Sequence, residues 1–230
     1  MINRSQSLKR IFPAFGLTLL ASLALAGFAA GSASALSFKP ANTSLTGAGG
    51  GVVWQAAGGP AYSCASSELS SMQSVGGTGG SINEPRLRGC KTVVLGFTVN
   101  CTTAGQPTGT ILASKLNFSL VWLDAAKTKF GFKLTPQSGA FAEFNCGGTP
   151  VKWTGSVLGQ ITKPPLNTAS TQALLSFTAS GSTQTYQQIG GEGTQYHLSE
   201  SRNGGAPAEV GLATETWITP TGGQLIEFTP

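Results

Sequence analysis

The sequence predicts an all-β domain, an antiparallel β-sandwich or barrel with little helix beyond the N-terminal segment. Apolar residues recur at every second position through most of the chain, and Gly, Ser and Thr are abundant. No window of helical length combines an i, i+3, i+4 apolar stripe with freedom from Gly, Pro and dense β-branching. Since glycine supplies positive φ at tight turns with little steric cost, this composition suits many short strands.

The clearest strand signals lie in the middle of the chain. Apolar and polar residues alternate over 116–122, a polar turn covers 124–128, and alternation resumes over 130–134, which predicts a hairpin with one apolar face. Further strands are expected at 142–146, 151–157, 173–179, 210–218 and 225–228. The regular spacing of large apolar residues argues against disorder outside two glycine runs, 47–51 and 76–80.

Four cysteines, Cys64, Cys90, Cys101 and Cys146, indicate two disulfides and an oxidising compartment. Their spacing is not that of a zinc site, because no C-x-x-C pair is present. Three connectivities are possible. We favour Cys64–Cys90 and Cys101–Cys146, since each pair would join neighbouring strands. In the chain-entropy description either disulfide is worth roughly 3–4 kcal/mol.

Residues 1–35 have the pattern of a cleavable secretory signal peptide. Three basic residues precede an almost purely apolar segment, and Ala33-Ser34-Ala35 supplies a small-x-small site, so cleavage is expected before Leu36. An uncleaved anchor is the alternative, because the apolar segment approaches the roughly 20 residues that span a bilayer. The favoured organisation is a signal peptide followed by one β-rich domain, 36–230, that is secreted or located at the cell surface without a stable membrane anchor.

The predicted mature domain is nearly neutral. Eleven Lys and Arg stand against nine Asp and Glu after residue 35. This balance gives no electrostatic footprint for nucleic acid. The one basic cluster, Arg86, Arg88 and Lys91, is interpreted as the solvated edge of a strand.

Few side chains are suited to catalysis. A Ser–His–Asp triad would need both His197 and Asp124, the single residues of their kinds, but the chain has no G-x-S-x-G elbow. His197 is therefore interpreted as a surface or structural histidine. One Asp is too few for a calcium loop, and no βα unit surrounds the glycine run 47–51 to make a phosphate site. No cofactor, metal or catalytic residue is predicted.

Glutamate and tryptophan offer two further routes to function. Glycoside hydrolysis needs two carboxylates facing each other across a cleft. The candidates are Glu143, Glu192, Glu200, Glu209, Glu215 and Glu227. Exposed aromatic rings could instead form a platform for sugars. Trp54 and Trp217 are the weak candidates for ligand binding, with Trp217 expected to be exposed, whereas Trp122 and Trp153 lie on apolar faces and are expected in the core.

Several short motifs in order along the chain carry a resemblance to known sequences. They are Cys64-Ala65-Ser66-Ser67, Gly89-Cys90, Cys101-Thr102-Thr103-Ala104-Gly105 with Gly109-Thr110-Ile111, Phe144-Asn145-Cys146-Gly147-Gly148, and Gly155-Ser156-Val157-Leu158-Gly159-Gln160-Ile161-Thr162 followed by Asn167. The chain resembles a group of exported bacterial proteins with Cys-Thr-Thr-Ala-Gly, Phe-x-Cys-Gly-Gly and Gly-Ser-Val-Ile-Gly motifs. The resemblance implies export, disulfides and a β fold, and it implies no particular activity.

The sequence favours a non-enzymatic exported domain that binds or structures a component of the cell envelope or of the extracellular space. The expected partner is a cell-wall or extracellular polysaccharide, or a surface protein. The alternative is a secreted polysaccharide hydrolase, which would require two Glu within about 5–10 Å in a cleft. A purely structural surface component, prone to self-association, is the third possibility.

Overall fold

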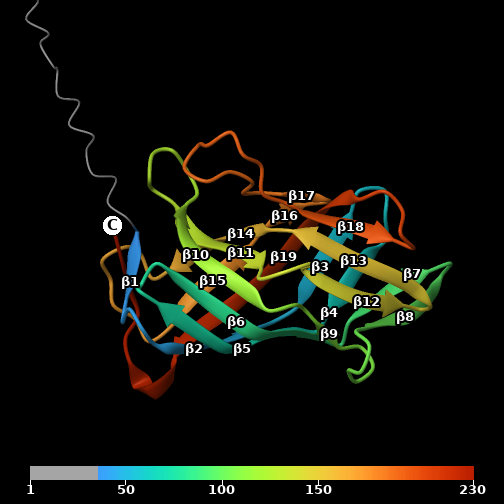
Figure 1. Cartoon of the computed structure of the whole chain (residues 1–230), viewed down its shortest axis with the longest axis horizontal. Coiled ribbons are helices and arrows are strands. Elements are labelled where there is room, and N and C mark those ends of the chain that lie inside the picture. The colour runs from blue at the N-terminus through green and yellow to red at the C-terminus, as the bar shows by residue number, and fades with distance from the viewer. Residues whose placement is uncertain (1–35) are drawn as a thin grey trace, which may run out of the picture. The chain divides into compact units, whose positions relative to one another are not determined.

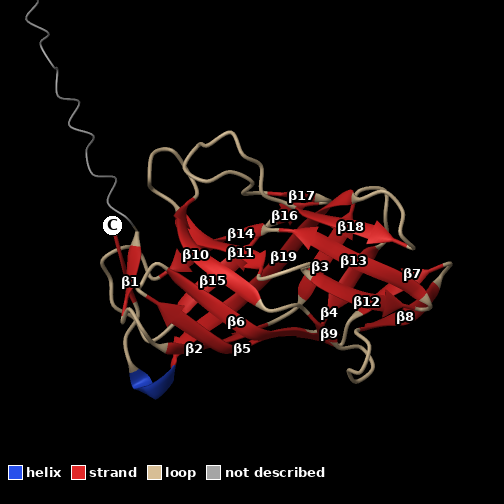
Figure 2. Cartoon of the chain, viewed as in Figure 1, coloured by secondary structure: helices blue, strands red, loops and turns tan. Residues whose placement is uncertain are grey.

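Strands make up nearly all the regular structure of the computed structural model, which describes residues 36–230 (Figure 1). Within this part of the chain the one helical element is a 3-10 turn, Thr221–Gly223 (η1), drawn in blue in Figure 2. The all-β prediction is confirmed. The predicted signal peptide, residues 1–35, lies outside the described residues. No helix of the described part is long and apolar enough to cross a membrane.

The strands of the main sheet close into two rings. Of the two predicted architectures, sandwich and barrel, the strand connectivity is therefore that of a barrel. The first ring consists of β2 (Ser44–Gly49), β5 (Ser66–Val75), β6 (Gly79–Arg88), β10 (Leu116–Trp122), β11 (Phe130–Pro136), β14 (Val157–Lys163), β15 (Ala173–Phe177) and β19 (Ala208–Pro220). The second ring consists of β3 (Val52–Ala56), β4 (Ala61–Cys64), β7 (Lys91–Val94), β8 (Phe97–Thr102), β12 (Ala142–Cys146), β13 (Thr149–Gly155), β18 (Leu198–Arg202) and β19 again. All pairings within both rings are antiparallel.

Strand β19 belongs to both rings because it is 13 residues long and changes partners near its middle. Its first half pairs with β18 and β3, with Leu212 opposite Trp54. Its second half pairs with β15 and β2, with Trp217 opposite Leu174 and Ala48. The two rings are therefore held together by the backbone of a single strand, as the central position of β19 in Figure 1 shows.

Three short strand pairs complete the fold. β1 (Ser37–Lys39) pairs with β20 (Glu227–Thr229), β9 (Ile111–Leu112) pairs with β6, and β16 (Ala179–Ser180) pairs with β17 (Thr183–Gln184). The β1–β20 pair contributes Phe38 and Phe228 to the core of the first ring of strands. The centroids of their phenyl groups lie 6.4 and 6.5 Å from that of Phe132. The paired ends of the described chain thus add to the packing of the first ring.

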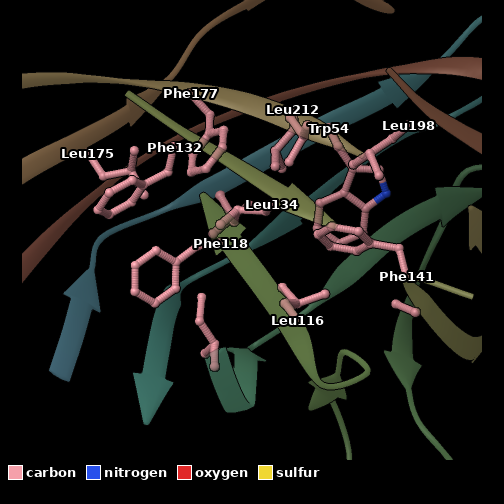
Figure 3. Close-up of a cluster of buried hydrophobic side chains, with 14 of the residues drawn as sticks. Trp54, Leu116, Phe118, Phe132, Leu134, Phe141, Leu175, Phe177, Leu198 and Leu212 are labelled. Atoms are coloured by element: carbon pink, nitrogen blue, oxygen red, sulfur yellow. The ribbon is translucent and has the colours of Figure 1, made fainter. Parts of the chain in front are cut away.

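One continuous apolar core fills both rings (Figure 3). Phe132 and Phe177 come from strands of the first ring, Trp54 and Leu198 come from the second, and Leu212 of β19 lies between them. The predicted hairpin over 116–134 is confirmed as β10 and β11, whose buried side chains alternate with more exposed ones along β10. The period-two pattern was therefore a reliable guide to the inward faces.

The glycine runs at 47–51 and 76–80, which the sequence left open to disorder, include strand residues of β2 and β6. A Cβ on Gly49 would lie 2.2 Å from Oγ of Ser67 and 2.4 Å from the carbonyl oxygen of Glu215. A Cβ on Gly80 would lie 1.9 Å from the carbonyl oxygen of Gln73. Glycine is required here because neighbouring strands approach too closely for any side chain.

Both disulfides have the favoured pairing, Cys64–Cys90 and Cys101–Cys146, and all four cysteines are buried. Cys101 and Cys146 are direct cross-strand partners on β8 and β12, with their Cα atoms 4.1 Å apart. The second ring has its shortest ladders at these places, since β8–β12 and β4–β7 each pair over two residues. The disulfides therefore close the second ring where hydrogen bonding is sparse.

Replacing Cys101 and Cys146 together by Ala is expected to lower the free energy of unfolding by about 2–5 kcal/mol, measured by denaturant unfolding of residues 36–230. The intact mass of the oxidised protein should be about 4 Da below that of the reduced protein, since each disulfide removes two hydrogens. Labelling of all four cysteines by a thiol reagent in non-reducing denaturant would contradict the assignment.

Candidate binding site at the end of the second ring

The two tryptophans named as weak ligand-binding candidates lie in different environments. Trp54 is only 1% exposed and belongs to the core of the second ring, so it forms no part of a surface platform. Trp217 is 40% exposed on the outer face of β19, as its alternation with the buried Thr216 and Ile218 requires. Of the two tryptophans expected in the core, Trp153 is 2% exposed and Trp122 is partly buried against the core.

The single histidine and the single aspartate have separate structural roles. Asp124 caps the loop between β10 and β11, where its carboxylate accepts hydrogen bonds from Thr128 and from the amide of Lys129. These bonds, with that of the Thr128 hydroxyl foremost, lower the pKa of Asp124. The backbone carbonyl of His197 accepts a hydrogen bond from the amide of Ser156. Neither residue is in a catalytic arrangement with the other.

The basic cluster at 86–91 lies on no free strand edge. β6 pairs with β5 along its length and with β9 at its C-terminal end. Arg86 forms an ion pair with Glu84, and Arg88 forms a two-bond ion pair with Glu68. The interpretation as a strand edge was therefore wrong, because ring closure leaves these residues on a continuous sheet, where acidic neighbours neutralise the two arginines.

The second ring contains a buried carboxylate, that of Glu200. Glu200 of β18 is 2% exposed and accepts three hydrogen bonds from side chains. Oε1 accepts from the Tyr62 hydroxyl at 3.0 Å and from Nε of Arg202 at 2.6 Å. Oε2 accepts from Nε1 of Trp153 at 3.0 Å. Three donors, one of them a guanidinium, replace the water that a buried carboxylate loses.

Aromatic rings surround this carboxylate. Trp54 stacks on Tyr62 with ring centroids 5.1 Å apart, and Trp153 meets Trp54 edge-on at 4.7 Å. Phe144 contacts the same group of rings edge-on. Burial, followed by the negative charge of Glu200, raises the pKa of the Tyr62 phenol well above its ordinary value. Tyr62 is therefore neutral and serves as a hydrogen-bond donor across the whole physiological range.

Arg202 connects this interior to the surface. Its side chain is 32% exposed, and within the described residues its Nη groups have no hydrogen-bond acceptor. The turn between β3 and β4 leaves space for it, because a Cβ on Gly59 would overlap Nη2 of Arg202. The guanidinium is thus fixed by one edge to Glu200 and keeps further N–H donors for another molecule.

A hollow of about 250 Å³ opens beside Arg202 at this end of the ring. Its polar wall includes Arg202 and Thr149, and its apolar wall includes Pro60, Val93 and Val151. These residues come from β18, β13, β7 and the turn before β4, so the strands of a closed ring position them. The hollow can hold a group that accepts hydrogen bonds on one side and presents C–H surface on the other.

Three other hollows in the described part of the chain offer less chemistry. A cavity of about 70 Å³ between the two rings is lined mainly by apolar side chains such as Leu134, Phe177 and Leu212. Two shallow hollows near β12 each have Glu143 as their sole acidic lining residue. Glu143 forms an exposed ion pair with Lys152. None of these hollows presents the two carboxylates that glycoside hydrolysis needs.

The fold and site together define a disulfide-linked β domain of two rings that share a strand, with a buried Glu200 paired to Arg202 in the wall of a surface hollow. Comparison of the chain with protein families, with curated proteins and with solved structures gives no match. The resemblance to exported bacterial proteins therefore stays a prediction, and the argument for function depends on the site itself.

Sequence reasoning missed Glu200 and Arg202 as a pair. Leu198, Glu200 and Arg202 occupy alternate positions of β18, so they share one face of the strand. Since Leu198 is apolar, that shared face could have been read as the inward one. A glutamate on a strand more often lies on the solvent face, as Glu143 does. Nothing in the local sequence indicated that Tyr62 and Trp153 would converge on one of the six candidate glutamates.

Arg202→Ala is expected to lower the free energy of unfolding by about 3–5 kcal/mol, because it leaves a buried carboxylate without its counter-ion. Glu200→Gln should cost less, about 1–3 kcal/mol, since Arg202 reaches solvent and the amide still accepts a hydrogen bond. Chemical denaturation measures both. Lys152→Ala, in the exposed Glu143 pair, is the control and should cost less than about 1 kcal/mol. Equal, small losses for Arg202→Ala and Lys152→Ala would contradict the burial of the charge.

The raised pKa of Tyr62 predicts a loss of stability at alkaline pH. The folded state favours the neutral phenol, so this contribution is complete below the ordinary tyrosine pKa of about 10 and is lost as pH rises beyond it. In Tyr62→Phe the unfolding free energy should fall less steeply as the pH rises through that range. Near-ultraviolet absorbance should show a tyrosine that ionises only as the protein unfolds, and this component should vanish in the variant. An unchanged titration in Tyr62→Phe would refute the assignment.

Proposed function

We propose that the chain is a non-enzymatic exported domain that binds a polysaccharide of the cell envelope or extracellular space in the hollow beside Arg202. One observation carries the proposal: Arg202 lines a surface hollow, and its guanidinium is fixed by a buried carboxylate while its Nη groups have no acceptor among the described residues. A fixed donor group loses little side-chain entropy on binding, which favours recognition. The two disulfides support an extracellular-type, oxidising environment.

The chemistry of the hollow suits a sugar unit. The Nη groups of Arg202 and the hydroxyl of Thr149 can bond to sugar hydroxyl or carboxylate oxygens. Val93, Val151 and Pro60 offer apolar surface for the C–H face of the same ring. Since Glu200 neutralises Arg202, the site does not demand a negative charge, and binding should depend only weakly on salt.

The hydrolase alternative has less support than binding. Both oxygens of Glu200 are engaged with donors, and the side chain is closed off from solvent. Glu143 lines two hollows without a second acidic residue among their lining side chains. A carboxylate that attacks or protonates a glycosidic bond must reach the substrate together with its counterpart. The surroundings of Glu200 and Glu143 therefore favour a binding domain.

Co-sedimentation of residues 36–230 with purified cell walls and with insoluble polysaccharides tests the proposal. We expect pelleting that persists at high salt and falls at least roughly tenfold in affinity for Arg202→Lys, which keeps the charge but loses the planar fork. Thr149→Val should weaken binding less. Trp217→Ala, on the outer face of the first ring, is the matched control. A tenfold loss of affinity in Trp217→Ala, with none in Arg202→Lys, would locate binding on the tryptophan instead.

Failure of the wild-type protein to pellet with any polysaccharide would overturn the proposal. Each variant should first be compared with the wild type by thermal unfolding, so that lost binding is not confused with lost structure. A release of reducing sugar by the wild-type protein, abolished by Glu143→Gln, would favour the hydrolase alternative.

A further inference from the structure

The hairpin of β7 and β8 carries the most exposed apolar side chains of the described chain. Leu95 at its tip is 93% exposed and Phe97 is 74% exposed, and Val93 beside them is also exposed. In Figure 1 the hairpin forms the right-hand end of the molecule. The outer part of the hairpin, residues 93–98, pairs only within itself, because the β4–β7 ladder ends at Thr92 and the β8–β12 ladder ends at Cys101.

Apolar side chains gather at the apex and on one face of this hairpin tip, while the other face carries Val93 beside its polar partner Thr98. Val93 and Val94 are neighbours on one strand, so their side chains project to opposite faces. Phe97 is the cross-strand partner of Val94 and adds to one face, while Leu95 occupies the apex. The most exposed apolar side chains, Leu95 and Phe97, therefore lie at the projecting end of the hairpin, which is the part that enters an apolar medium first.

The turn itself shows that Leu95 is not there for local structure. Leu95 has φ of 50° and Gly96 has φ of 84°, so both central residues of a two-residue turn are left-handed. Such turns prefer Asn, Asp or Gly at the first of these positions. Glycine has no Cβ to clash, and the short side chains of Asn and Asp can form local hydrogen bonds, whereas Leu does neither. Leu95 neither relieves the backbone nor packs in the core. Its exposed apolar side chain is therefore the property that needs a reason.

We infer that the β7–β8 tip inserts into the interfacial layer of a phospholipid bilayer. From the last paired residue, Thr92, to Leu95 the hairpin spans about 10 Å, which matches the 5–10 Å depth of interfacial apolar burial. Lys91, exposed at the base of β7, lies at the level of the headgroups when the tip is inserted and can contact their phosphates. The tip contains no charged residue.

This inference goes beyond the proposed function and does not depend on it. Insertion uses Leu95 and Phe97, which do not line the hollow, whereas sugar binding uses the donors of Arg202 and the apolar wall that includes Val93. The hairpin tip would hold the domain at a membrane surface, with the hollow at its base. A second copy of the chain is the competing occupant of the tip, and self-association separates the two.

The test is flotation of residues 36–230 with phosphatidylcholine vesicles, with and without phosphatidylglycerol. We expect the wild type to bind both, and to bind the anionic vesicles somewhat more tightly because of Lys91. Leu95→Asn should weaken binding at least roughly tenfold, and the double variant with Phe97→Ser roughly a hundredfold, since each change removes a large apolar side chain from the bilayer. Leu95→Asn should leave the thermal midpoint unchanged or raise it, because Asn suits the turn.

Val75→Ser is the matched control, since Val75 is also exposed at the end of a hairpin strand but stands without apolar neighbours at a glycine turn. It should bind vesicles as the wild type does. Binding to neither vesicle overturns the inference, as does binding only to anionic vesicles that salt removes and Leu95→Asn leaves intact. A dimer that forms without lipid and is lost in Leu95→Asn would assign the tip to a second copy. Polysaccharide pelleting of Leu95→Asn should be unchanged, which keeps the two proposals separate.

Discussion

The sharing of β19 by two closed rings is the constraint from which the rest of the fold follows. One strand supplies a wall to each ring, so the register of every neighbouring strand refers back to it. Leu198 lies opposite Val210 of β19, which turns that face of β18 inward and takes Glu200 with it. The inward face of β19 continues through Leu212 and Ile218 into the first ring. A change in the register of β19 would reverse both interiors at once.

Burying Glu200 costs folding stability and fixes the position of the Arg202 guanidinium. A buried carboxylate is costly to desolvate, and well-packed apolar residues would often serve stability equally well. Here Tyr62 and Trp153 hold the carboxylate of Glu200, and that carboxylate fixes the guanidinium of Arg202 at the edge of an aromatic core. Fixing a donor group in this manner is useful for recognition and has little value for folding alone. The adjacent β7–β8 hairpin shows the same preference, since Leu95 occupies a turn position that another residue would fill with less strain.

The sequence predicted what depends on local alternation and missed what depends on ring closure. The β10–β11 hairpin and both disulfides follow from period-two patterns and from cysteines near paired strands. The convergence of Tyr62 and Trp153 on Glu200 and the burial of Trp54 depend on strands distant in the chain, which no local pattern specifies. The glycine runs that left disorder open are places where strands approach closely. In the sequence a glycine that permits a close approach of strands cannot be told from a glycine in a disordered segment.

Side-chain NMR of Arg202 tests the central claim, that a guanidinium fixed by Glu200 is the recognition group, most directly. Residues 36–230 contain three arginines, Arg86, Arg88 and Arg202, so their Nε–H signals can be resolved and assigned by substitution. Soluble fragments of the bound polysaccharide would be titrated into the labelled protein. The account predicts that the Arg202 signal shifts together with the amides of Thr149 and Val93. Shifts confined to Trp217 and its neighbours, with Arg202 unchanged, would contradict it.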